Sequence, residues 1–192
     1  ESRAGVVTDD GYRLRLRVFA SVGANMNANQ FVQLLQDIPK ILESIDHSDA
    51  LQSGAAIAEK SIRANFQRQE DSFGRRWEPR RVTIFPDEIQ SRWRNHPLLI
   101  LTGRLIGAAT GGLGHTRTVT AKRLKMGIDP NVVPYAAVHN FGGFSTLPNG
   151  KPIMIPEREF FYLHKSDRKS LRAMFVKRTR EKFLKKLEQR VR

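Results

Sequence analysis

The first part of the chain alternates apolar and basic side chains, which is the pattern of a strand with one buried face. The apolar positions are Leu14, Leu16, Val18, Ala20 and Val22, and the basic ones are Arg13, Arg15 and Arg17. A period of two places these sets on opposite faces of a strand over residues 12–22. Outward arginines also discourage pairing between exposed strand edges. The pattern therefore predicts a strand with a strongly basic solvated face.

The next segment changes to the three- and four-residue spacing of amphipathic helices. Asn27 is a suitable N-cap for a first helix, whose apolar positions recur up to Ile45. Pro39 interrupts this stripe and is expected to kink or split the helix. A polar turn over residues 46–49 then leads into a second amphipathic helix, whose apolar positions extend from Leu51 to Phe66. Because the connecting turn is short, the two helices are expected to form an antiparallel hairpin.

Residues 70–81 are polar and predict a long loop, followed by a short helix over residues 87–94. Phe73 and Trp77 are expected to anchor the loop to the core. With Trp93 and the neighbouring arginines, these aromatic side chains could instead stack on nucleic-acid bases. We favour the anchoring interpretation, in which the arginines make ion pairs at an interface.

A glycine cluster and an alternating segment follow. Four glycines between Gly107 and Gly114 predict a mobile loop. Leu113 stands where a phosphate-binding loop would carry lysine, so the cluster fails that motif. Residues 116–128 begin with alternating β-branched positions and predict one strand, bulged near residues 122–123.

The remaining segments predict a short helix, a hairpin and a long helix. Pro134 favours a helix over residues 135–141, and the glycines at 142–143 end it. Residues 144–155 predict a hairpin, and Ser166 is a suitable cap for a last amphipathic helix. The short helix carries Tyr135, Val138 and Phe141 at three-residue steps, so we expect one face to bury all three.

Charge is the feature of the composition that bears most on function. The 192 residues include 33 Lys and Arg against 19 Asp and Glu, a net charge of +14. Residues 164–192 hold twelve basic and three acidic residues, an excess of nine. Such an excess attracts polyanions, so nucleic acid or an acidic protein surface is an expected partner. The longest apolar run, residues 97–101, is too short to span a membrane.

No catalytic, cofactor or metal motif emerges from the sequence. The chain has no cysteine, and its five histidines share no metal-ligand spacing. Its paired acidic residues are sequence neighbours whose side chains point apart, and no serine lies in a nucleophile elbow. We therefore expect a protein that is not an enzyme and that uses no cofactor.

Four segments together resemble the phage virion-morphogenesis or tail-completion proteins. In chain order they are F-G-R-R-W (residues 73–77), L-T-G-R-L (101–105), Y-A-A-V-H-N-F-G-G (135–143) and I-P-E-R-E-F (155–160). The resemblance extends from about Asn27 to Leu171. Two features depart from the family pattern: Glu159 replaces a usual proline, and a strand precedes the usual helical start.

The resemblance implies an α+β fold, with an antiparallel sheet on which an N-terminal helical hairpin and a C-terminal amphipathic helix pack. It divides the chain into an arm (1–26), a tail-completion core (27–165) and a basic helix (166–192). The structural residues that it implies are Gly74, Trp77, Gly103, Tyr135, His139, Phe141, Gly142, Pro156 and Arg158. The basic residues expected to face a partner or DNA are Arg13, Arg15, Arg17, Lys182, Lys185, Lys186 and Arg190.

The function implied by the resemblance is completion or termination of the phage tail and its joining to the head. Such a subunit would form a ring of six copies around a lumen through which DNA passes. Its partners would be the tail tube and the head–tail connector, at the head–tail junction of a virion assembled in the bacterial cytoplasm. The alternative from the charge alone is a free basic nucleic-acid-binding protein.

Overall fold

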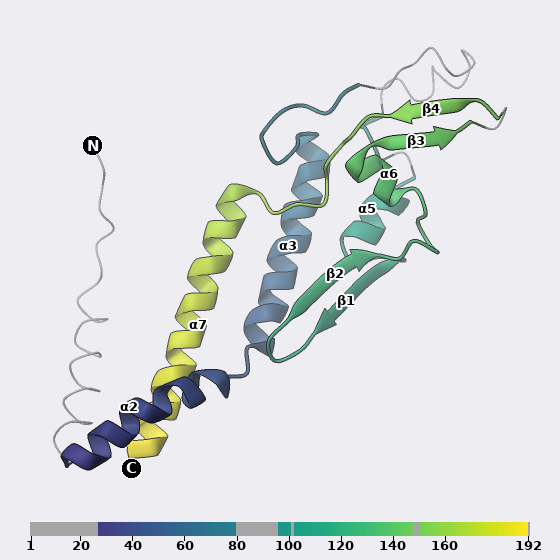
Figure 1. Ribbon diagram of the computed structural model, residues 1–192. Coiled ribbons are helices and arrows are strands. Elements are labelled where there is room, and N and C mark those ends of the chain that lie inside the picture. The colour runs from purple at the N-terminus through teal and green to yellow at the C-terminus, as the bar shows by residue number, and fades with distance from the viewer. Residues whose placement is uncertain (1–26, 80–95, 101, 148–149, 192) are drawn as a thin grey trace, which may run out of the picture. The chain divides into compact units, whose positions relative to one another are not determined.

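The computed structural model describes residues 27–79, 96–100, 102–147 and 150–191. The predicted strand at 12–22, with Arg13, Arg15 and Arg17, and the predicted helix at 87–94 lie outside these ranges. The helices are α2 (Ala28–Glu43), α3 (Ser48–Arg68), α5 (Arg104–Ala109), α6 (Ala136–Phe141) and α7 (Lys165–Val191) (Figure 1). The strands are β1 (His115–Val119), β2 (Leu124–Ile128), β3 (Gly143–Thr146) and β4 (Pro152–Ile155).

This mixture of helices and antiparallel strands confirms the α+β class. Its strands form two separate two-stranded sheets, β1–β2 and β3–β4, rather than one sheet. The chain divides into two compact units, one of residues 1–46 with 176–192 and the other of residues 47–175. The division into an arm, a core and a basic helix stays a prediction, as does the packing of α2 against α3.

In the first unit, α2 begins as its sequence predicts. The side chains of Asn27 and Gln30 accept hydrogen bonds from each other's backbone N–H groups, both at 2.9 Å, which forms a capping box. The helix is not split at Pro39, because a proline removes a single backbone donor and the turns on both sides stay helical. Leu34 and Ile41 pack against Leu187 of α7 and form the apolar centre of this unit.

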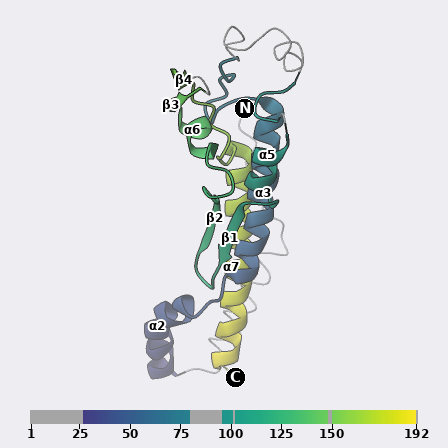
Figure 2. The same cartoon turned by 90° about the vertical axis from the view of Figure 1, so that its right-hand side faces the viewer.

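In the second unit, the core forms where α3 meets α5 and the segments that carry the motifs. Ile62 and Phe66 of α3 are buried with Trp77, Leu105 and Phe160. These α3 positions lie four residues apart and therefore share one face. Figure 2 shows α3 beside α5 and the β1–β2 hairpin, in agreement with the contacts among these elements.

The predicted bulged strand over 116–128 is a hairpin, so that prediction is wrong in detail. The chain reverses between Thr120 and Arg123, whose backbone groups share a 2.9 Å hydrogen bond from N to O. Thr120 Oγ1 also accepts from the Arg123 N–H at 3.0 Å. The turn was missed because a threonine hydroxyl, rather than glycine or proline, satisfies its backbone donor.

The predicted glycine loop begins inside a helix and is closely packed, and its mobility stays a prediction. Gly107 lies inside α5, and its carbonyl oxygen accepts from Gly112 N at 2.7 Å. A Cβ on Gly112 would lie 3.0 Å from the Gly107 backbone, and one on Gly114 would lie 2.9 Å from Val132 Cγ1. Two of these glycines therefore permit a close approach of the backbone to neighbouring atoms.

The last three predicted elements are present. Helix α6 ends at Gly142, whose φ is 71°, and the β3–β4 hairpin follows. Helix α7 begins at Lys165, so Ser166 is its second residue and not its cap; the Nδ1 of His164 lies 2.8 Å from Ser166 Oγ. No helix in the described part of the chain has the length and hydropathy to cross a membrane.

Candidate interaction site

The first motif forms a tight turn that presents Trp77 to the core. The Asp71 carboxylate accepts from the N–H groups of Phe73 and Arg75, both at 2.9 Å, and Gly74 adopts a φ of 79°. Trp77 is buried, and its Nε1 donates to the Glu159 carbonyl at 3.2 Å. Trp77 is thus an anchor as predicted, whereas Phe73 is 81% exposed and is not one.

The fourth motif joins the first and the third through Arg158. Its buried guanidinium donates from Nε to the Glu78 carbonyl at 3.0 Å, and from Nη2 to the Pro79 carbonyl at 3.4 Å. Its backbone N–H donates to the His139 carbonyl at 2.9 Å. Arg158 therefore ties together segments about eighty residues apart in the sequence, and charge-assisted donors to carbonyls make this connection strong.

Two buried asparagines complete the cluster, and the sequence analysis missed them as functional residues. Asn140 Oδ1 accepts from the N–H groups of Phe160 and Phe161 at 3.1 and 2.9 Å. Asn65 Nδ2 donates to the carbonyls of Phe160 and Tyr162 at 3.0 and 2.9 Å. The available signal was an amide at an apolar helical position: Asn65 shares the buried face of α3 with Ile62 and Phe66.

Gly142 is required for both its conformation and its small size. Its φ is 71°, and a Cβ there would lie 3.0 Å from the Glu157 backbone nitrogen. Gly103, the N-cap of α5, has a φ of 69° but open space around it, so it is required for its conformation alone. Pro156 directly precedes this Glu157–Phe160 segment.

The buried face of α6 is opposite to the predicted one. Tyr135 and Phe141 are exposed, and Phe141 reaches 73%. The buried residues are Ala136 and Asn140, four residues apart. The prediction failed because it followed hydrophobicity, whereas the asparagine is drawn inward by two backbone donors that no other residue satisfies in the contacts described.

His139 is the titratable group at the centre of the motif cluster. Burial lowers the pKa of His139, and the positive charge of Arg158 lowers it further. Its Nδ1 is buried without a hydrogen-bond partner among the residues described. Its ring packs edge-to-face with the ring of Tyr135, with 5.8 Å between the two ring centroids. Within the described ranges, no group of three or more His, Cys, Asp or Glu side chains could hold a metal ion.

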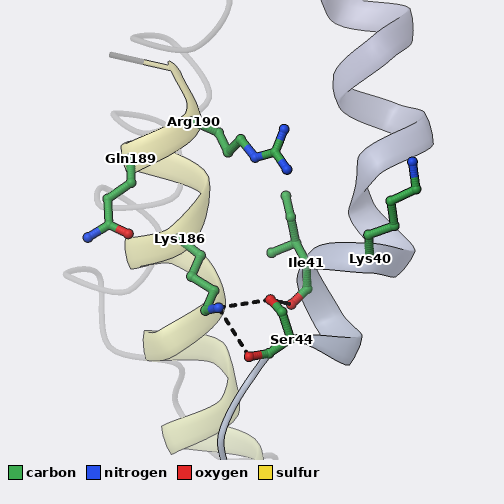
Figure 3. A pocket seen from close by; sticks show the side chains of 6 residues that line it. All are labelled: Lys40, Ile41, Ser44, Lys186, Gln189 and Arg190. Carbon is green, nitrogen blue, oxygen red and sulfur yellow. Dashed lines mark hydrogen bonds between the residues drawn. The ribbon is translucent and has the colours of Figure 1, made fainter.

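The predicted basic residues of α7 separate into two sets. Lys182, Lys186 and Arg190 recur every four residues and contact the α2 region: Lys182 Nζ donates to the Asp46 carbonyl, and Arg190 Nη1 donates to Asp37 Oδ2 at 3.0 Å. Lys186 Nζ donates to the Ser44 carbonyl and hydroxyl oxygens at 3.1 and 2.8 Å (Figure 3).

The contacts of Lys182 and Lys186 place cations just beyond the C-terminal end of α2, where the helix dipole is negative. Arg190 instead pairs with the Asp37 carboxylate inside the helix. Lys186 and Arg190 also line a pocket of about 450 Å³ with Lys40, Ile41, Ser44 and Gln189 (Figure 3). Each cation of this pocket has an acceptor in the chain, since Lys40 Nζ lies 3.5 Å from Asp37 Oδ1. The contacts of Lys182, Lys186 and Arg190 therefore stabilise the packing of α2 against α7 within their unit.

The second set comprises exposed cations. Lys185 is exposed, and so are Lys165, Lys169 and Arg172 in the first turns of α7. The latter three follow steps of four and three residues, so they share one face of the helix. Among the residues described, none is an ion-pair partner of these three. The exposed charge of this helix therefore includes the predicted Lys185 and three further cations that the sequence analysis did not single out.

The fold and the site define a structural scaffold: an α+β protein whose motif residues hold distant chain segments together. A model of the phage virion morphogenesis family matches residues 28–178. The chain therefore belongs to the phage virion morphogenesis family, a structural family, and has a role in building the phage virion. Comparisons with curated proteins and with solved structures give no match.

Proposed function

We propose that this protein completes or terminates the phage tail and joins it to the head. The observation that carries the proposal is the family match over residues 28–178, which includes all four motifs. The motifs support this role because they build shape: Trp77, Arg158 and Asn140 fix loops and present no reacting group. The protein acts by stoichiometric binding at the head–tail junction and catalyses no reaction.

In this proposal, the copies form a ring of about six around a DNA-filled lumen, between the tail tube and the connector. A ring needs heterologous contacts, in which one patch of a copy meets a different patch of the next. The exposed face of Lys165, Lys169 and Arg172 supports a polyanionic neighbour, either the DNA or an acidic surface of the tube or connector.

Cryo-electron microscopy of particles, combined with native mass spectrometry of the purified protein, tests this role. We expect density for a ring of this chain between tail and head, and particles without the protein should have unjoined heads and tails. A strictly monomeric protein that is absent from the junction would contradict the proposal.

The same exposed cations keep a second function open, that of a free nucleic-acid-binding protein. Gel-shift titrations between 50 and 200 mM salt separate the two functions. Six or more phosphate contacts would weaken binding about 10³-fold or more over that range. A ring subunit that meets DNA only inside the assembled lumen should bind weakly as a free chain, with a shallow salt dependence.

A further inference from the structure

The outer face of the β3–β4 hairpin is an exposed apolar surface. Phe144 pairs with Met154 across the two strands, so both side chains lie on one face, and they are 76% and 45% exposed. The next pair on that face, Thr146 and Pro152, is exposed too. We call the surface formed by these four residues the hairpin face; it carries no charged side chain.

The opposite face of the hairpin is already partly covered. Ile153 and Ile155 of β4 are only partly exposed and alternate with Met154. A strand with apolar residues on both faces is typical of a position covered from both sides. A two-stranded hairpin alone in water is at best marginally stable. We therefore expect another protein surface to cover the hairpin face.

Among the residues that the structure describes, a second apolar surface without a partner lies on α2. Phe31, Leu35 and Leu42 are each nearly half exposed, and with the partly buried Ile38 they follow steps of four, three and four residues. They share one face of the helix, which we call the α2 face. It differs from the side of α2 where Leu34 and Ile41 meet α7.

We propose that the hairpin face of one copy docks on the α2 face of the next copy. This inference rests on the ring assembly proposed above and names its contact. A head-to-tail contact requires two different surfaces on one chain, and the hairpin face and the α2 face provide two. Copies that each carry a charge of +14 repel one another through their basic surfaces, so an uncharged contact is the favourable one. Aromatic and methionine side chains are also enriched in interface cores.

Complementary variants of the full chain test the contact. Phe144→Glu disables the hairpin face, and Leu35→Glu disables the α2 face; native mass spectrometry and light scattering measure assembly. Each variant alone should raise the concentration for half-assembly at least about tenfold, as expected at an interface hot spot. Mixed together, they should form a 1:1 heterodimer that does not grow, because each supplies one intact face.

Leu113→Glu is the matched control, since Leu113 is 79% exposed and belongs to neither face. It should assemble like the wild type. Circular dichroism monitors folding, and Phe144→Ser with Leu35→Ser forms a milder second pair. Single variants that assemble like the wild type, or a mixture that stays monomeric, overturn this contact while leaving the ring proposal standing.

Where the wild type assembles only on particles, cross-linking gives the same measurement. The chain has no native cysteine, so Leu35→Cys and Phe144→Cys on separately expressed copies report only contacts between copies. We expect disulfide-linked pairs in particles that contain both variants. Junction rings without this cross-link overturn the contact, whereas particles without any ring overturn the proposed function.

Discussion

The contacts that stabilise the interior of one compact unit differ in kind from those inside the other. The unit of residues 47–175 has an aromatic core in which Phe66 lies 5.0 Å from Phe160 and 6.0 Å from Trp77, between ring centroids. The other unit relies on Leu34, Ile41 and Leu187, with charged side chains around them. The larger unit is therefore stabilised by an extensive buried core, and the smaller one by a small apolar cluster together with cations paired with carbonyls and a carboxylate.

This difference predicts how the stability of each unit responds to salt and to substitutions. Buried apolar contacts and buried amide hydrogen bonds are insensitive to salt, whereas exposed charge contacts are screened. Substitutions in the motif cluster should therefore have large effects, and substitutions on the cationic face of α7 should have smaller, salt-dependent ones. Four experiments examine this, in order of decreasing effect.

Phe160→Ala should have the largest effect. Phe160 is only 1% exposed and packs on Phe66, so its removal leaves a cavity and should cost about 3–5 kcal/mol of unfolding free energy. Urea unfolding followed by tryptophan fluorescence measures the loss. Phe73→Ala, at an 81% exposed position, is the control and should change stability by less than about 0.5 kcal/mol. Equal losses would contradict the assignment of the core.

Gly142→Val should be the next most damaging. A β-branched residue at a φ of 71° is strained, and its Cβ would lie 3.0 Å from the Glu157 nitrogen, for a combined cost of about 2–4 kcal/mol. Gly74→Val shares the strain, with a φ of 79°, but its Cβ meets nothing within 4 Å. The difference between the two melting curves isolates the steric part. Unchanged thermal stability of the Gly142 variant would refute the requirement for glycine.

Lys186→Glu and Lys185→Glu compare neighbours on α7 and sharpen the distinction between the two sets of cations. The first replaces a donor to the Ser44 carbonyl with a carboxylate near the negative end of α2, and should destabilise its unit by about 1–2 kcal/mol. The second changes an exposed side chain and should be neutral within about 0.5 kcal/mol.

Hydrogen exchange of the α2 amides at low and high salt provides the measurement. Faster exchange should be confined to the Lys186 variant, and salt should speed exchange in the wild type.

Because Lys186 and Arg190 contact α2, reversing Lys185, Lys186 and Arg190 together would mix a packing effect with any effect on a partner. Reversing Lys165, Lys169 and Arg172 is the cleaner test of partner binding, because these cations have no described ion-pair partner.

The pH dependence of stability should give the smallest effect. Burial and the Arg158 charge lower the pKa of His139 in the folded state below its ordinary value of 6.5. Below about pH 6.5 the unfolded chain therefore binds a proton that the folded chain does not, so stability falls as the pH drops through this region. Unfolding at pH 5.5 and 7.5 should show a steeper loss in the wild type than in His139→Gln. Parallel losses would contradict this role of His139.

Local patterns were sufficient for many of the elements. Helical spacing predicted α2 and α3, and Asn27 was correctly placed as a cap. Gly142 correctly marked the end of α6, because a positive φ is a local requirement that glycine meets. The β1–β2 turn and the closely packed glycines of 107–114 were missed, since their stability comes from a threonine hydroxyl and from close packing rather than from local propensity.

The candidate site was less predictable than the fold. Trp77 and Arg158 were identified through their motifs, but their partners were not, because hydrogen bonds to Glu159 and Glu78 span about eighty residues. Lys186 was expected to face a partner, which stays a prediction, and its contact with the Ser44 carbonyl was not foreseen, because that carbonyl is available only where α2 ends. Charge alone does not tell a contact within the chain from one with another molecule.

The sequence by itself determined the α+β class, the positions of α2, α3, α6, the β3–β4 hairpin and α7, the family and the excess of positive charge. These follow from spacing, composition and motifs, all of which are properties of neighbouring residues. Only the tertiary structure decided which face of α6 is buried, that Asn65 and Asn140 lie inside, and which cations remain exposed. The physical reason is that burial depends on contacts such as Asn65 with Phe160, 95 residues apart, which no local pattern encodes.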